Sequence, residues 1–160
     1  MTEVSEYFQS ELKKESDEYS QKLQINMQKL LDKMINNERT VRVSKDFAVR
    51  VTDNFDDESK SEGQFAVVSF AYIGGILKML QSEEHLATKE YPLVLDGPFS
   101  KLDADKRQSV VNTIPEFAPQ VIILSKDDLG DVLPTERVGK VWTIESNKKQ
   151  NVSVIKEGRI

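Results

Sequence analysis

The stretch YPLVLDGPFSKLD, residues 91–103, joins a short apolar run to two acids. The run Leu93 to Leu95 is apolar on both faces, which is typical of a strand buried in a parallel sheet. It stops at Asp96, turns through glycine and proline, and reaches Asp103. Ligands of open parallel sheets bind beyond the carboxyl ends of the strands, so Asp96 is placed to hold a hydrated magnesium ion. For this residue alone, a turn-capping aspartate is the alternative.

Strand and helix patterns alternate on both sides of this stretch. Residues 64–81, QFAVVSFAYIGGILKMLQ, are apolar for long enough to favour a buried helix, residues 103–114 have a helical pattern, and residues 121–124 form an apolar strand. Strand, helix, strand in this order predicts parallel pairing with a right-handed crossover. We therefore expect an α/β fold whose mainly parallel sheet is flanked by helices.

Strands are also expected in two other parts of the chain. The period of two over 41–51, broken by Lys45-Asp46, predicts a hairpin or two short strands. Residues 138–145 and 152–156 are rich in β-forming residues.

The N-terminal segment has a different character. Residues 3–37 contain no proline or glycine and carry interleaved charges, and their apolar residues recur mostly every three or four positions. This stripe predicts one long amphipathic helix with a coiled-coil seam, the alternative being an ordinary surface helix. No other helix of comparable length is expected in the chain to cover this seam. We expect two regions, a coiled-coil helix over 1–38 and an α/β lobe over 39–160. The stripe consists of Phe8, Leu12, Tyr19, Leu23, Met27, Leu30 and Met34.

The composition excludes some kinds of site and indicates where the protein is located. The chain has 160 residues, a net charge of −5 and no cysteine, which excludes disulfides and thiolate metal sites. We expect no membrane span and no signal sequence, hence a cytoplasmic protein. The basic residues are scattered among acids, so no DNA-binding patch is assigned.

Two short motifs carry a family resemblance. The run Asp96 to Asp103, DGPFSKLD, resembles the Walker B and D-loop run of ATP-binding cassette (ABC) ATPases, typically DEPTSALD, and matches it at five of its positions: Asp96, Pro98, Ser100, Leu102 and Asp103. Upstream, the residues Ser61-Glu62-Gly63-Gln64 resemble the signature motif LSGGQ, with Lys60 where leucine is usual. The motifs occur in the family's order, with a buried helix between them.

The layout of coiled coil, two short strands and signature helix resembles the C-terminal half of a split ATPase head of the structural-maintenance-of-chromosomes (SMC) class, closest to DndD-type DNA-modification and defence ATPases. The resemblance implies ATP and Mg²⁺ as cofactors, a homodimer of heads, and DNA as a partner of the complete complex. In the family, the signature motif contacts the nucleotide held by the other head. The resemblance assigns nucleotide binding to Ser61, Glu62, Gly63 and Gln64, the metal and catalysis to Asp96, and the dimer interface to Ser100, Lys101, Leu102 and Asp103.

Three departures from the family pattern limit these assignments. The sequence contains no GxxxxGK[ST] phosphate loop, so we expect an N-terminal lobe carrying it, in the same longer protein or on a separate chain. Gly97 stands where most cassette ATPases place a catalytic glutamate, and Lys126 stands where a switch histidine is usual. Lys126 is a candidate γ-phosphate contact, with a solvated loop lysine as the alternative. The single histidine, His85, is expected at the surface.

Two functions remain open. The first is one half of a coiled-coil ATPase acting in DNA modification, repair or defence. The second is a non-hydrolysing dimerisation or scaffold module, which Gly97 favours. A transporter-type cassette ATPase is disfavoured by the N-terminal coiled coil.

Overall fold

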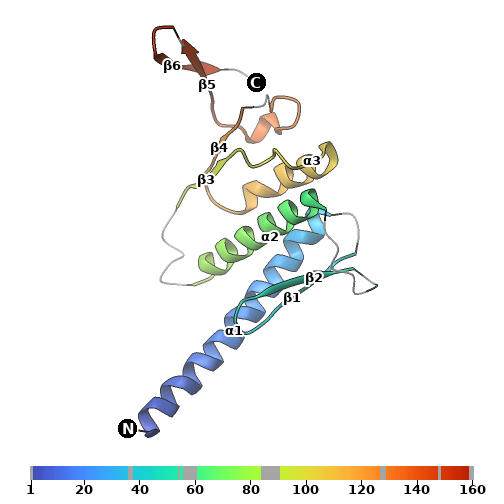
Figure 1. Ribbon diagram of the computed structural model, residues 1–160, viewed down its shortest axis with the longest axis vertical. Helices are drawn as coiled ribbons and strands as arrows, with labels where there is room; N and C mark the ends of the chain where they lie inside the picture. The colour runs from blue at the N-terminus through green and yellow to red at the C-terminus, as the bar shows by residue number, and fades with distance from the viewer. Residues whose placement is uncertain are drawn as a thin grey trace.

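The computed structural model describes residues 2–35, 38–53, 55, 61–83, 91–126, 129–147 and 149–158. The elements follow the order predicted from the sequence. They are α1 (Thr2–Met34), β1 (Thr40–Val43), β2 (Val49–Thr52), α2 (Glu62–Gln81), β3 (Leu93–Asp96), α3 (Ala104–Thr113), the 3₁₀ turn η1 (Ile114–Glu116), β4 (Val121–Leu124), the 3₁₀ turn η2 (Thr135–Arg137), β5 (Val141–Asn147) and β6 (Val152–Gly158). The N-terminus of α1 and the β5–β6 hairpin lie at opposite ends of an elongated molecule (Figure 1).

The apolar stripe of α1 is exposed in the first part of the helix and buried in the second. Phe8 and Leu12, near its beginning, are exposed. The later part of the stripe is buried against the chain's own α2 and β1, with Leu23, Met27 and Leu30 in the core. The coiled-coil expectation therefore applies only to the projecting first part of the helix. The second part packs intramolecularly against α2, which at 20 residues is shorter than the 33-residue α1 but covers this part of the stripe.

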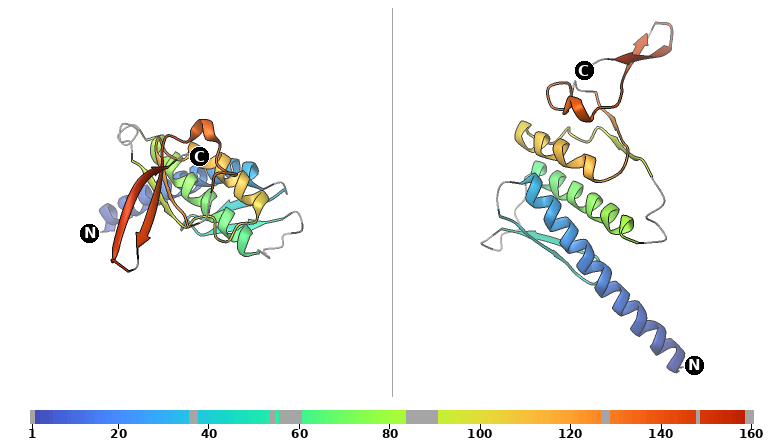
Figure 2. Two further views of the ribbon diagram at one scale, coloured as in Figure 1. Left: turned by 90° about the horizontal axis from the view of Figure 1, so that it is seen from above. Right: turned by 180° about the vertical axis from the view of Figure 1, so that it is seen from behind.

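The helices α1 and α2 pack against each other (Figure 2). A Cβ atom at Gly74 would lie 2.6 Å from Phe117 Cε1 and 2.7 Å from Leu30 Cδ1, and a Cβ atom at Gly75 would lie 2.9 Å from Met27 Cγ. Two glycines therefore let α1 and the 3₁₀ turn after α3 approach the α2 backbone.

Contrary to the sequence expectation, α2 is long and apolar enough to cross a membrane. Buried helices of soluble proteins pass the same test. In this structure α2 packs against α1 and α3.

Strands β3 and β4 pair in parallel, with Leu93 opposite Val121 and Asp96 opposite Leu124. Alternate residues of both strands pack against the core through one face of this sheet. The other face is apolar and exposed, with Val94 at 56%, Ile122 at 40% and Leu124 at 47% exposure. Parallel sheets are ordinarily covered on both faces, so this pair has the composition of an interior sheet without its outer cover.

The other two sheets are antiparallel hairpins, β1 with β2 and β5 with β6. In the part of the chain that the structure describes, only the β3–β4 pair is parallel, so the expectation of a mainly parallel sheet is wrong. The physical reason is the short connection inside each hairpin, which allows only antiparallel pairing. The β5–β6 hairpin projects from the rest of the molecule (Figure 1).

Candidate functional site: the signature turn and the loop after β3

The first candidate element is the N-terminus of α2, which we call the signature turn, Ser61 to Gln64. Ser61 is the N-cap of α2: its Oγ accepts a hydrogen bond from the Gln64 N–H at 3.2 Å, and Gln64 Oε1 accepts one from the Ser61 N–H at 3.0 Å. This reciprocal capping box fixes the conformation of the turn. The N–H groups of Glu62 and Gly63 belong to the first helical turn, where a helix offers no internal acceptors. The turn can therefore present N–H donors, at the positive end of a helix dipole, to an anion.

The second element is the loop after β3, Ser100 to Asp103. Asp103 begins α3: its Oδ1 accepts a hydrogen bond from the Lys106 N–H at 2.9 Å, and its Oδ2 accepts one from the Lys106 ammonium group. These two interactions, the ammonium group first, hold the pKa of Asp103 below its usual value. The expectation that Asp103 starts the next helix is confirmed.

These two elements lie against each other. A Cβ atom at Gly63 would be 3.2 Å from the backbone oxygen of Lys101 and 3.6 Å from Cδ of Lys106. Lys101 Nζ also lies 3.8 Å from Glu62 Oε1, a contact between exposed side chains. Glycine at position 63 therefore allows the signature turn to pack on the backbone of the loop. Although about forty residues separate them in sequence, the fold makes them one surface.

Asp96 and Lys126 lie at the carboxyl ends of neighbouring parallel strands. Asp96 is exposed at the last position of β3, and Lys126 is exposed two residues beyond the end of β4. The Gly97 N–H donates to Leu124 O at 2.8 Å, which extends the pairing past Asp96. Gly97 has φ +56°, a left-handed conformation that favours glycine over glutamate.

A magnesium ion fits this edge in part. The described residues contain no group of three or more metal-binding side chains, but magnesium keeps several waters and needs only one or two carboxylates together with phosphate oxygens. Asp96 could supply one such carboxylate. The remaining ligands would come from the nucleotide and from another lobe.

The remaining predicted site residues differ in their exposure. Leu102 is only 5% exposed and belongs to the core, so its side chain anchors the loop and is not part of an exposed interface. Ser100 and Lys101 are exposed. Lys60 and His85 lie outside the described residues. Lys106, which pairs with Asp103 and lies next to Gly63 of the signature turn, was missed by sequence reasoning, although an aspartate and a lysine three residues apart on a helix were a usable signal.

Comparison with solved structures defines the class of this fold: it is that of SMC ATPase head domains. No protein-family model and no curated protein matches the sequence. A structure described as "Structural biochemistry of ATP-driven dimerization and DNA stimulated activation of SMC ATPases" matches with a TM-score of 0.65 and 16% identity, over 87% of this chain and 84% of that chain.

Two further matches come from named organisms. The SMC head domain from Thermotoga maritima has a TM-score of 0.61 and 15% identity over 95% of this chain. The Smc head domain with a coiled coil and joint from Pyrococcus yayanosii has a TM-score of 0.63 and 18% identity over 86% of this chain. The matched regions span 52% and 26% of those two chains, respectively. At these identities the similarity establishes the fold, and functional assignments remain proposals.

Proposed function

We propose that this chain is the C-terminal lobe of an SMC-like coiled-coil ATPase head acting in DNA modification, repair or defence, with the DndD type as the nearest subgroup. It supplies the signature turn, the Walker B aspartate and the D-loop to a head that dimerises when ATP is bound. A second lobe, in the same longer protein or on a separate chain, supplies the phosphate loop. A cytoplasmic location and contact with DNA through the complete complex are parts of the same proposal.

The contact of Gly63 with the backbone of Lys101 carries this proposal. A helix N-terminus alone is a common feature, and so is a strand-end aspartate. Here the turn that resembles a signature motif and the loop that resembles a D-loop meet on one surface, which is what a shared dimer interface requires. The SMC-head fold supports the same assignment.

Each residue has a distinct role in this scheme. The N–H groups of Glu62 and Gly63 and the Ser61 hydroxyl would bind the γ-phosphate of a nucleotide on the other head. Asp96 would hold magnesium through water, and Lys126 would place a positive charge near the phosphates. ATP with Mg²⁺ supplies the transferable phosphoryl group. Ser100 and Lys101 would contact the second head.

The exposed face of β3–β4 supports the existence of a covering lobe. Two parallel strands with an apolar outer face do not form a stable unit by themselves. A further lobe placed over Val94 and Ile122 would bury this face and would bring a phosphate loop to the strand edge that carries Asp96.

The decisive test is ATP-driven dimerisation of a reconstituted head. The chain is combined with a lobe carrying a phosphate loop, and its mass is measured by sedimentation with and without Mg²⁺-ATP. We expect an ATP-dependent dimer that Ser61→Arg abolishes while ATP binding by a single head is retained. Thr135→Arg, at an exposed position in η2, is the matched control. A dimer insensitive to Ser61→Arg would contradict the proposal.

The conformation of Gly97 favours a second candidate, a scaffold that dimerises without hydrolysis. A left-handed backbone disfavours glutamate at this position, so the usual water-activating carboxylate is missing there. Phosphate release by the reconstituted head separates the two functions. An ATPase loses turnover with Asp96→Ala, whereas a scaffold is equally inert with and without the substitution but still dimerises with ATP.

A further inference from the structure

Two glutamine side chains in the C-terminal half of α1 form hydrogen bonds with backbone groups of β1 and of the residue before it. Gln28 Oε1 accepts from the Val41 N–H at 2.8 Å, and Gln28 Nε2 donates to Arg39 O at 2.8 Å. One helical turn earlier, Gln24 Oε1 accepts from the Val43 N–H at 2.9 Å. The two glutamines thus bind the edge of β1 that faces away from β2, as a neighbouring strand would.

The spacing of helix and strand makes this pairing possible. Residues four apart on a helix are separated by about 6 Å along its axis, and residues two apart on a strand by about 6.6 Å. Gln28 therefore lies opposite Val41, and Gln24 lies opposite Val43. The same bonds satisfy backbone groups of an otherwise open strand edge. We call Gln24 and Gln28 the glutamine pair.

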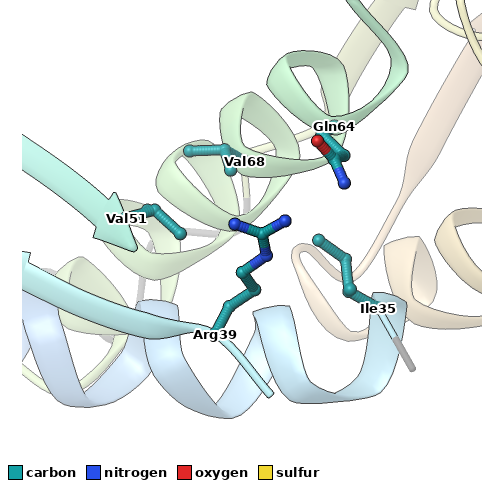
Figure 3. A pocket seen from close by; sticks show the side chains of 5 residues that line it. All are labelled: Ile35, Arg39, Val51, Gln64 and Val68. Carbon is teal, nitrogen blue, oxygen red and sulfur yellow. The ribbon is translucent and has the colours of Figure 1, made fainter. Parts of the chain in front are cut away.

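Arg39, the residue before β1 whose backbone oxygen accepts from Gln28, lines a pocket next to the signature turn. The side chain of Arg39 is only 13% exposed, and its guanidinium group lies 3.9 Å from Asp53. Arg39 lines a small pocket with Ile35, Val51, Gln64 and Val68, and Figure 3 shows the guanidinium group of Arg39 and the amide group of Gln64 both pointing into it. Gln64 is the residue whose side chain caps the Ser61 N–H.

Hydrogen bonds join Gln28 to the backbone of Arg39 at one end and Gln64 to Ser61 at the other. Between these two ends, the largely buried side chain of Arg39 lines the same small pocket as Gln64. We propose that Gln28 and Arg39 are positioning residues that couple the projecting helix α1 to the signature turn, so that a displacement of α1 reaches the residues that would contact nucleotide. The nucleotide part of this inference rests on the proposed function, whereas the coupling itself does not.

Backbone-amide hydrogen exchange of the full chain, followed by NMR, tests the coupling without ATP. Truncation by Arg39→Ala removes the largely buried side chain that lines the pocket shared with Gln64 and Val68 of α2. We expect exchange about tenfold faster at the Gln64 and Phe65 amides, which bond to Ser61, and no change at the Arg107 amide in α3, which bonds to Asp103 O. Arg39→Met, which keeps a long apolar stem, is expected to restore most of the protection.

Gln28→Ala tests the other end of the connection, with Gln21→Ala, exposed on the same helix, as its control. We expect faster exchange at Val41 and at the signature turn with Gln28→Ala only. Arg42→Ala, exposed on β1, is the control for Arg39→Ala.

Two results would overturn the inference. One is an unchanged signature turn in the Arg39 and Gln28 variants. The other is acceleration of the α3 amides to the same extent, which would mean a general loss of stability. If the wild-type head fails to dimerise with ATP, the proposed function fails, while the exchange pattern still decides the coupling.

Discussion

Gly97 stands between the two acids of the stretch that defines this fold, and its backbone explains its identity. Its φ is +56°, and nothing lies within 4 Å of the position that a Cβ atom would occupy. The restriction is therefore one of backbone conformation and not of space. A glutamate at this position would carry conformational strain or would change the path of the loop after Asp96.

The conformational strain at position 97 can be measured by substituting alanine, which adds one methyl group. Gly97→Ala is expected to lower the free energy of unfolding by about 1 kcal/mol, because alanine disfavours the left-handed region. Gly139→Ala is the control, since Gly139 also has open space around its Cβ position but no left-handed φ. Urea unfolding measures both. Equal effects of the two substitutions would mean that Gly97 does not keep this conformation in solution.

Asp103 gives a prediction that depends on pH. The Lys106 ammonium group and the Lys106 N–H hold the pKa of Asp103 below its usual value. The charged form is thus favoured by folding, so the stabilisation is present above the unfolded-state pKa, about 3.9, and is lost as the pH falls through the folded-state pKa. Asp103→Ala is expected to lower the urea midpoint at pH 7, and the difference from wild type is expected to shrink below about pH 4.

The substitution Asp103→Asn is the comparison variant for the same cap. Asparagine caps helices well but carries no charge for Lys106. We expect Asp103→Asn to retain most of the stability at pH 7. A difference between Asp103→Ala and wild type that stays constant from pH 7 to pH 3 would contradict the role of the charged carboxylate.

At the level of elements, the sequence predicts the kind and order of the helices and strands well, because apolar periodicity reflects burial directly. The strand Val121–Leu124 has the predicted bounds, and α3 lies within one residue of its expected range. The sequence could not show which partner each apolar stripe packs against. The stripe on α1 therefore predicted a coiled coil throughout, although its second part lies in the core. The glutamine pair and Arg39 were also missed, since their bonds depend on tertiary packing.

The crossing of α1 and α2 is held by close contact, which makes it sensitive to added volume. Gly74→Ala is expected to lower the free energy of unfolding by roughly 1–3 kcal/mol, because its methyl group would meet Phe117 and Leu30. The clash outweighs the higher helix propensity of alanine, about 1 kcal/mol. Phe65→Ala, at a position 65% exposed on α2, is expected to change stability by less than about 0.5 kcal/mol. Thermal or urea unfolding decides between them, and a stabilising Gly74→Ala would show that the helices are further apart.

On the scale of the whole molecule, the candidate site is an edge that needs two further surfaces. Under the proposed function, the signature turn and the loop after β3 would face a second head, while Asp96 and the outer face of β3–β4 would face a phosphate-loop lobe. The sequence motifs predicted these residues as the site, and that assignment stays a prediction. Their contact through Gly63 and Lys101 could not be predicted, because it depends on how α2 and α3 pack.

The last prediction concerns the exposed face of β3–β4. Val94→Glu replaces an apolar side chain that is already 56% exposed, so we expect little effect on the stability of this chain alone. In the two-lobed head the same position would be buried, and an unpaired carboxylate there would oppose docking. We therefore expect Val94→Glu to weaken binding of the phosphate-loop lobe at least tenfold by calorimetry, and Ile25→Glu, on an exposed position of α1, to leave it unchanged. Equal binding by both variants would place the second lobe on another surface.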